Sequence, residues 1–263
     1  MDKIKLSTEI NLVLSSFCRG DAGRSIAFYT KNIGLLHVNG DIQRPVASIM
    51  KVPLLMALYD MAASHEVDLS QKVKISNFTK TRYCSILTAF DPGTELTLRE
   101  VAALSLITSD NPIAIYITGI VGFERVNSVL RRLGCDTRAV MAAGFTEDEL
   151  GPKNRVNQAS ANDLILVFNE VLQNSRYEDL DKALANNLRN NRLPALLPDS
   201  AIVSHKTGSL NGVINNAGTV RDGEASFTLA VLTDDQADPL ATTTEMAICC
   251  KQVYDLIMSA PSS

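Results

Sequence analysis

The stretch Ser48-Ile-Met-Lys-Val-Pro-Leu54 marks the point at which the pattern of the chain changes from strand to helix. Before it, apolar runs of strand length at 25–30 and 34–38 are separated by a polar turn. After it, apolar residues recur at helical spacing in one segment after another, up to about Pro198. Pro53 costs the first helix one backbone hydrogen bond, so we expect its first turns to be irregular.

Strand patterns return after this helical block, and an apolar helix ends the chain. Two-stranded pieces would be only marginally stable alone, so we expect the N- and C-terminal strands to join in one antiparallel sheet. The predicted fold class is therefore α/β in the α+β arrangement, a sheet flanked by helices with an inserted all-helical lobe. We predict a mixed α/β lobe from residues 1–47 and 199–263, a helical lobe from 48–198, and an active-site cleft between them. The expected helices are 8–17, 50–63, 98–107, 112–120, 123–133, 161–173 and 240–258, and the expected later strands are 202–206, 213–220 and 227–232.

The composition excludes several classes of protein. The 263 residues are 46% hydrophobic and 21% charged with a net charge of -4, which argues against disorder and offers no basic surface to nucleic acid. No apolar stretch approaches the roughly 20 residues that a membrane helix needs. We expect a monomer that binds a small-molecule substrate, with no nucleic-acid partner and no membrane span.

Neither a metal nor a cofactor is expected. The three histidines are far apart in the sequence, and the five cysteines form no C-x-x-C pair, so we expect buried, reduced thiols. Residues 1–11 lack the apolar core of a secretory signal. The expected location is the cytoplasm if the chain is complete as given, and the periplasm or the outside of the cell if a signal peptide has been removed.

Three short motifs follow one another along the chain: Ser48-Ile-Met-Lys51, Ser109-Asp110-Asn111 and Lys206-Thr207-Gly208. A chain of this composition would contain by chance about one S-x-x-K, roughly a tenth of an S-D-N and about a few hundredths of a K-T-G. The first motif alone therefore means little, whereas the ordered trio is a signature of active-site-serine acyl transfer. Taken singly, the second motif is also compatible with a helix N-cap and the third with a turn at a strand end.

Ser48 is the predicted nucleophile. Its hydroxyl and backbone N–H lie at the start of a helix, where the helix dipole favours developing negative charge. Lys51 comes three residues later, on the same face one turn away, so its amine is within reach of that hydroxyl. Lys51 can act as a base only if burial and a neighbouring cation lower its pKa, and we expect Lys206 to be that cation.

The second motif supplies the predicted proton relay. Ser109 and Asn111 stand directly before Pro112, whose fixed φ suits the first turn of a helix. The Ser109 hydroxyl can pass a proton between the lysines and a leaving nitrogen. The Asn111 amide can hold a substrate carbonyl.

The third motif supplies the predicted contacts with the acyl group and with a substrate anion. Lys206 would attract a substrate carboxylate, and Thr207 would hydrogen-bond it. Gly208 would allow a close approach to the backbone. The backbone N–H groups of Ser209 and Ser48 would together form an oxyanion hole.

A longer stretch extends the resemblance to a known family. Residues 91–100, Asp-Pro-Gly-Thr-Glu-Leu-Thr-Leu-Arg-Glu, run on into the second motif and resemble the P-G-T-x-L-T-x-R-E segment of class A β-lactamases. The continuation of the serine helix to Leu54 and the start of a helix at 159–166 are also similar. The resemblance to class A β-lactamases and penicillin-binding proteins covers most of the chain. It implies a two-lobed β-lactamase/transpeptidase-like fold and an acyl-enzyme mechanism.

Two parts of that family's pattern differ here. The resemblance implies a loop glutamate that activates the deacylating water, within R-x-x-E-x-x-L-N; residues 144–151 lack the arginine and the asparagine. Glu147 is the candidate general base and Glu149 the fallback, with a solvated acidic turn as the alternative. The family's arginine after the third motif is also absent from 210–216, so we expect low affinity for ordinary penicillins. Arg221, the nearest arginine, is expected in a hairpin turn.

The leading functional prediction is a class A-like β-lactamase that hydrolyses the β-lactam amide through an acyl-enzyme on Ser48. Two alternatives remain open. One is a serine amidase, esterase or transacylase with a different substrate, because fold and motifs do not fix the substrate. The other is a penicillin-binding or sensing module that is acylated without turnover, which would need no deacylating base.

Overall fold

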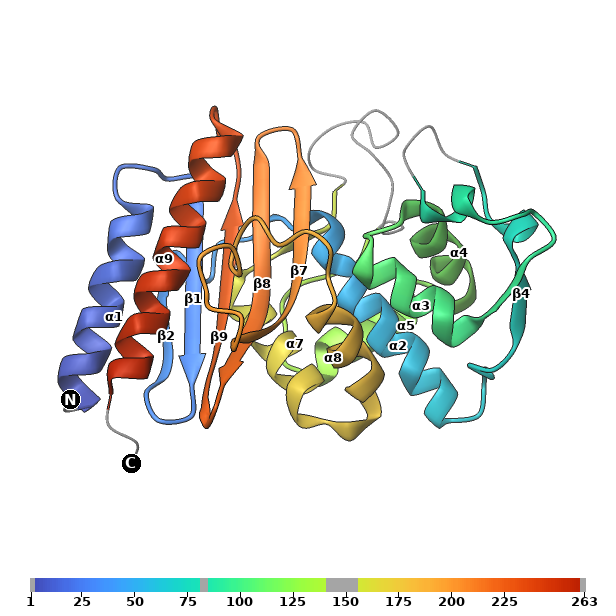
Figure 1. Ribbon diagram of the computed structural model, residues 1–263, viewed down its shortest axis with the longest axis horizontal. Coiled ribbons are helices and arrows are strands. Elements are labelled where there is room, and N and C mark those ends of the chain that lie inside the picture. The colour runs from blue at the N-terminus through green and yellow to red at the C-terminus, as the bar shows by residue number, and fades with distance from the viewer. Residues whose placement is uncertain (1–2, 81–84, 141–155, 261–263) are drawn as a thin grey trace.

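The computed structural model describes residues 3–80, 85–140 and 156–260. Its centre is an antiparallel five-stranded sheet in the order β2-β1-β9-β8-β7 (Figure 1). The predicted fold class is confirmed, because strands from both ends of the chain pair directly, as Ala27 of β1 does with Ala230 of β9. The strands are β1 (Arg24–Thr30), β2 (Gly34–Val38), β7 (Ile202–Leu210), β8 (Val213–Asp222) and β9 (Ala225–Thr233).

Helices cover both faces of this sheet. On one face, α1 (Lys3–Cys18) and α9 (Pro239–Ser259) lie side by side (Figure 1) and enclose a core with side chains of β1, β8 and β9. On the other face, α7 (Ala161–Gln173) packs across β1, β8 and β9. The sheet is therefore covered on both sides, which explains why successive residues of β8 and β9 are buried without alternation.

The remaining helices surround α2 (Lys51–Ala63), whose residues 51–59 are all buried. A helix that is apolar all round is typical of the centre of a helical core. It packs against α3 (Leu98–Ile107), α4 (Asn111–Val121), α5 (Phe123–Arg132) and α8 (Glu178–Ala185). Short elements complete the fold: β3 (Arg44–Pro45) with β6 (Gln158–Ala159), β4 (Lys72–Lys74) with β5 (Glu95–Thr97), and the 3-10 helices η1 (Ala47–Met50), η2 (Ile75–Asn77), η3 (Ile86–Ala89) and η5 (Ser175–Tyr177).

Capping side chains explain why some boundaries could be predicted. The helices expected at 98–107 and 161–173 have these bounds in the structure. Thr97 and Glu100 form a capping box at the start of α3, and the Ser160 side chain accepts from the backbone of Asp163 at the start of α7. The irregular start of the serine helix is also confirmed, because Ala47–Met50 form a 3-10 turn before α2.

Other boundaries differ from the prediction. The first helix begins at Lys3 rather than at residue 8, and β7 continues through the third motif to Leu210. Helix α7 falls within the predicted helical lobe, yet it packs on the sheet of the other lobe. The division of the chain into two lobes at 47/48 and 198/199 stays a prediction.

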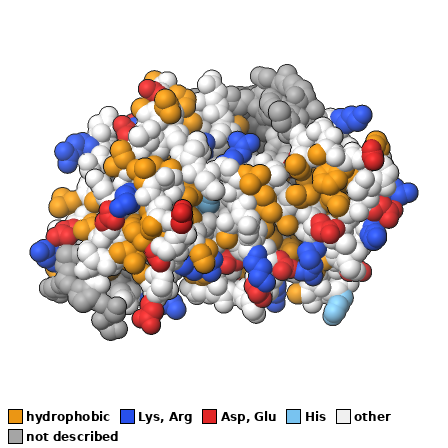
Figure 2. Space-filling model, in the orientation of Figure 1, with side chains coloured by type: hydrophobic (Ala, Val, Ile, Leu, Met, Phe, Trp, Pro, Cys, Tyr) orange, Lys and Arg blue, Asp and Glu red, His pale blue; other side chains and the backbone are white. Residues whose placement is uncertain are grey.

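The surface carries charges of both signs in a mixed pattern (Figure 2), with no single-sign field over the face shown. In the described part of the chain, no single helix has the length and apolar composition of a bilayer span. Helices α4 and α5 would satisfy both criteria only as a pair, and they meet at an angle of 84°.

Candidate active site

The segment before Ser48 packs tightly against strand β7. A Cβ added at Gly208 would lie 2.6 Å from the Val46 carbonyl oxygen and 3.1 Å from Ala47 Cβ. Gly208 is therefore required for this close approach of two backbones. Ala47 has a φ of 52°, in the left-handed region that non-glycine residues rarely adopt. Ser48 follows it as a half-buried residue of η1, between the sheet and α2.

Lys51 is fully buried directly behind Ser48. Its Nζ lies 3.3 Å from Ser48 Oγ and donates to the Ser109 carbonyl oxygen at 2.7 Å and to Asn111 Oδ1 at 2.8 Å. Burial lowers the pKa of Lys51 to about 7, against the carboxylate of Asp110, which raises it. A pKa near 7 leaves a substantial neutral fraction at physiological pH, so this amine can accept a proton.

Lys206, the neighbouring cation that we expected, lies across the Ser109 hydroxyl from Lys51, and the charge of Arg189 lowers the pKa of both lysines. The electrostatic repulsion between the two lysines is reciprocal. Burial, together with the charge of Lys51, lowers the pKa of Lys206 well below its usual value. Two ammonium groups in one buried site repel, so the site disfavours full protonation of both.

The Ser109 hydroxyl lies between the two lysines. Lys206 Nζ donates to Ser109 Oγ at 2.8 Å, and Lys51 Nζ lies 3.4 Å from the same oxygen. Ser109 has a φ of 62°, so its backbone takes a left-handed turn directly before α4. The turn points its carbonyl oxygen at Lys51 while the hydroxyl meets Lys206.

Asp110 and Asn111 complete the second motif. Asp110 is the N-cap of α4, where its side chain accepts from the backbone N–H of Ile113 at 3.1 Å. Its other oxygen accepts from Ser85 Oγ at 2.6 Å and from the backbone N–H of Ile86 at 2.9 Å. The N-cap interpretation thus holds for Asp110, while Ser109 and Asn111 face the lysines.

Arg192 is a charged residue of this region that sequence reasoning missed. Its side chain, 7% exposed, donates to the carbonyl oxygens of Gly208 at 2.8 Å and of Asn215, and to Ser209 Oγ at 2.5 Å. Burial lowers its pKa to about 10, so it remains charged at neutral pH. It lies in the polar segment between α8 and β7, where no pattern in the sequence distinguishes it from other loop arginines.

The predicted site residues thus fall into two groups. Those brought together are Ser48, Lys51, Ser109, Asn111, Lys206, Thr207, Gly208 and Ser209, since β7, η1 and the turn before α4 meet here. Glu147 and Glu149 lie outside the described residues. The expectation for Arg221 was wrong: it lies within β8, is ion-paired with Asp181 at 2.9 Å, and precedes the hairpin turn that links β8 to β9.

The geometry supports nucleophilic chemistry that uses side chains alone. A hydroxyl, a buried amine with a pKa near 7, a second hydroxyl and a second buried amine follow one another within hydrogen-bonding distance. In the described part of the chain, no three His, Cys, Asp or Glu side chains are grouped as metal ligands. The expectation that the protein needs no cofactor stays a prediction.

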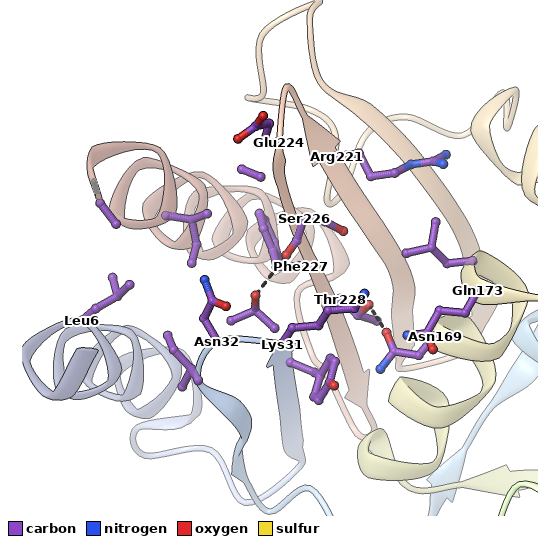
Figure 3. A pocket seen from close by; sticks show the side chains of 17 residues that line it. Leu6, Lys31, Asn32, Asn169, Gln173, Arg221, Glu224, Ser226, Phe227 and Thr228 are labelled. Atoms are coloured by element: carbon purple, nitrogen blue, oxygen red, sulfur yellow. Dashed lines mark hydrogen bonds between the residues drawn. The ribbon is translucent and has the colours of Figure 1, made fainter. Parts of the chain in front are cut away.

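A separate hollow of about 810 Å³ lies at the opposite end of strand β8 (Figure 3). The β1–β2 turn and the β8–β9 hairpin meet α1, α7 and α9 there. Its walls include Lys31, Asn32, Asn169 and Gln173, with apolar contributions from Leu6 and Phe227. None of the predicted site residues that the structure describes lines it.

Comparisons with known proteins agree with the fold and identify a family. The model of the beta-lactamase enzyme family matches residues 5–257. A beta-lactamase of Bacteroides uniformis is 24% identical over 253 residues, which cover 88% of this chain and 84% of that protein. Beta-lactamase VEB-1 of Pseudomonas aeruginosa is 23% identical over 207 residues, covering 74% of this chain and 68% of that protein.

Solved structures give a similar result. The beta-lactamase from Sphaerobacter thermophilus superposes with a TM-score of 0.84 at 20% identity, covering 97% of this chain and 99% of that one. A PBP-A variant, solved as an acyl-enzyme complex with penicillin G, superposes with a TM-score of 0.81 at 20% identity, covering 98% and 97%. At these identities the superpositions establish the fold.

Proposed function

Because the chain belongs to the beta-lactamase enzyme family, we propose that it is a class A-like β-lactamase that hydrolyses the amide bond of a β-lactam through an acyl-enzyme on Ser48. The observation that carries the proposal is the pair formed by Ser48 and Lys51. Their Oγ and Nζ atoms lie 3.3 Å apart, and burial lowers the Lys51 pKa to about 7. A neutral amine at this distance can take the proton of the attacking hydroxyl.

In the proposed acylation, the Oγ of Ser48 forms a bond to the lactam carbonyl carbon while its proton passes to Lys51. The carbonyl oxygen becomes an oxyanion, stabilised by the backbone N–H groups of Ser48 and Ser209. The close approach of Gly208 to the Val46 carbonyl supports this arrangement, because it keeps the two backbone segments together.

Collapse of the tetrahedral intermediate breaks the C–N bond of the lactam. The leaving nitrogen takes the proton of the Ser109 hydroxyl, which recovers one from Lys51 or Lys206. The contacts of Ser109 Oγ with both Nζ atoms support this relay, at 3.4 Å and 2.8 Å. Asn111, whose Oδ1 already binds Lys51, would hold the amide side chain of the substrate.

Recognition of a substrate carboxylate is proposed for the third motif. Lys206 and Thr207 border the site from β7, and Arg192 adds a buried positive charge directly behind Gly208 and Ser209. In this proposal Arg192 would supply the positive charge that the sequence lacks after the third motif, and the low affinity for ordinary penicillins that we expected from that absence stays a prediction.

Deacylation completes the proposed cycle. A water molecule would attack the acyl carbonyl carbon, lose its proton to Glu147, or to Glu149 as the fallback, and release the Ser48 oxygen. The proton held by the glutamate then passes, by way of the Lys51 amine, to the departing Ser48 oxygen, which restores the hydroxyl, the neutral amine and the carboxylate.

The test combines intact-mass spectrometry with absorbance on the same mixture of protein and a chromogenic cephalosporin. Steady turnover without a lasting adduct is expected, and Ser48→Ala should abolish both adduct and turnover. Glu147→Gln, compared with Glu149→Gln, would then reveal which variant accumulates the acyl-enzyme. Absence of any reaction in the wild-type protein would contradict the proposal and leave a different amide or ester as the substrate.

A penicillin-binding module is the second candidate. The structural similarity to PBP-A, whose variant was captured as a penicillin G acyl-enzyme, favours it. A stoichiometric adduct on Ser48 that persists for hours without turnover would support this candidate over hydrolysis.

A further inference from the structure

The loop between α8 and β7 is attached to β7 at successive points. Asn187 Nδ2 donates to the carbonyl oxygens of His205 at 3.2 Å and of Leu106 at 3.4 Å. Further along the same loop, Arg192 donates to Gly208 and Ser209 of β7. The segment that carries Arg192 is therefore held beside the strand of the third motif at both of its ends.

Between the contacts of Asn187 and those of Arg192, the side chain of His205 supplies a third attachment of the loop. Its Nε2 lies 3.0 Å from Asn190 Oδ1 in the loop, and its Nδ1 lies 3.1 Å from the side-chain amide of Asn216 on β8. With the proton on Nε2, the neutral ring donates to Asn190 and accepts from Asn216 Nδ2, so both nitrogens are satisfied. The ring thus connects the loop to the two strands that border the site.

The sheet makes room for this ring. Gly218 lies opposite His205 in the pairing of β7 with β8, and a Cβ added there would lie 2.4 Å from His205 Cβ and 2.6 Å from the Ser204 carbonyl oxygen. Burial lowers the pKa of His205 to about 4, and the charges of Lys206 and Arg192 act in the same direction; a bond donated by the protonated ring to Asn216 Oδ1 only partly opposes them. The ring stays neutral at physiological pH, so its donor and acceptor pattern is fixed.

We propose that His205 is a positioning residue, which holds Arg192 in place through Asn190 and thereby sets the affinity of the site for the carboxylate of the substrate. Asn190 stands two residues before Arg192, and His205 directly precedes Lys206. One ring therefore fixes the relative position of two cations that come from different parts of the chain. The second half of the proposal rests on the proposed function.

Asn190→Ala is the primary test, because it removes one hydrogen-bond acceptor and leaves the buried ring in place. Asn191→Ala is its matched control, because the neighbouring asparagine is exposed and takes no part in the contacts described above. The substrates are a chromogenic cephalosporin and its methyl ester, which lacks the negative charge. Asn190→Ala should raise KM for the carboxylate about threefold to tenfold, with kcat within about twofold, and leave the ester unaffected.

A double-mutant cycle tests whether Asn190 acts through Arg192. Arg192→Ala should raise KM for the carboxylate more than Asn190→Ala does, and the double variant should match Arg192→Ala alone. Additive effects of the two substitutions, or equal effects on carboxylate and ester, would overturn the positioning role.

Hydrogen exchange of the free protein tests the attachment without any substrate. The amides of residues 189–192 should exchange about tenfold faster in Asn190→Ala and in His205→Phe than in the wild-type protein, and Asn191→Ala should leave them unchanged. Equal exchange in all variants would refute the attachment. Faster exchange in a protein that turns over no β-lactam would support it while contradicting the proposed function.

Discussion

Lys206 Nζ donates to Ser109 Oγ at 2.8 Å, and this bond joins the edge strand of the sheet to the turn before α4. Lys51 Nζ approaches the same hydroxyl at 3.4 Å. One hydroxyl thus serves two buried lysines, of which the first lies within reach of the nucleophile. Protonation of this group of residues therefore controls both the proposed attack and the proposed departure of the leaving nitrogen.

The charge of Arg189 should contribute, after burial, to the pH at which activity appears. Lys51 must be neutral to act as a base, so kcat/KM should rise with pH through the Lys51 pKa of about 7. Arg189 lowers that pKa, so Arg189→Ala should shift the rise to higher pH. The pH profile of cephalosporin hydrolysis measures this shift. Arg131→Ala on α5, which breaks an ion pair with Glu124, is the control and should leave the profile unchanged.

Substitution of Asp110 should shift the profile in the opposite direction. Its carboxylate raises the Lys51 pKa, so in Asp110→Asn activity should appear at lower pH. The variant also weakens the contacts with Ser85 Oγ and the Ile86 amide, so we expect a loss of roughly 1–3 kcal/mol in the free energy of unfolding. Urea unfolding and the pH–rate profile separate the two effects. A shift to higher pH would contradict the electrostatic role given to Asp110.

Gly208→Ala should impair both stability and catalysis. The new Cβ would meet the Val46 carbonyl oxygen at 2.6 Å, so β7 and the segment before Ser48 must separate. We expect a loss of about 1–3 kcal/mol in stability and a fall of roughly 10-fold to 100-fold in kcat, because the proposed oxyanion hole widens.

Gly119→Ala is the comparison for this variant. That glycine lies on the exposed side of α4 with nothing within 4 Å of the added Cβ. The substitution should stabilise the protein by about 0.5–1 kcal/mol and leave kcat unchanged. Thermal melts and initial rates of both variants give the comparison, and equal effects of the two would refute the steric argument.

Tyr177→Phe should affect stability alone. The buried Tyr177 hydroxyl donates to Asp60 Oδ1 at 2.7 Å and accepts from Arg132 Nη2 at 2.8 Å, in a network that joins α2, α5 and η5. Loss of this hydroxyl should lower the free energy of unfolding by about 1–2 kcal/mol. Chemical denaturation measures the cost, while kcat and KM should stay at wild-type values because the network includes none of the site residues. A change in kcat or KM of the folded variant would contradict this expectation and show that α2 transmits the perturbation to Ser48.

The sequence predicted those features of the fold that depend on neighbouring residues in the chain, such as the ends of capped helices. The ends of α3 and α7 were predictable because Thr97 and Ser160 cap them. The meeting of the three motifs followed from the expectation that both ends of the chain share one sheet. By contrast, Arg192 and His205 act through contacts between a loop and two strands, and no periodicity or motif indicates such contacts. The left-handed backbone of Ala47 depends on tertiary packing and leaves no sequence signal either.

Helix α2 carries Lys51 at its first residue, and its residues 51–59 are all buried. Val52, Leu55 and Leu58 are as inaccessible as Lys51 itself. Random mutagenesis with selection for activity should therefore deplete substitutions throughout residues 51–59, both where side chains pack and where they take part in the chemistry. Tolerance to mutation would then not distinguish residues needed for packing from residues needed for catalysis. A screen that measures the amount of folded protein separately from turnover would single out Ser48 and Lys51. The same constraint limits how this segment can diverge: new specificities would arise more readily in the loop between α8 and β7 than in the helix that begins at the site.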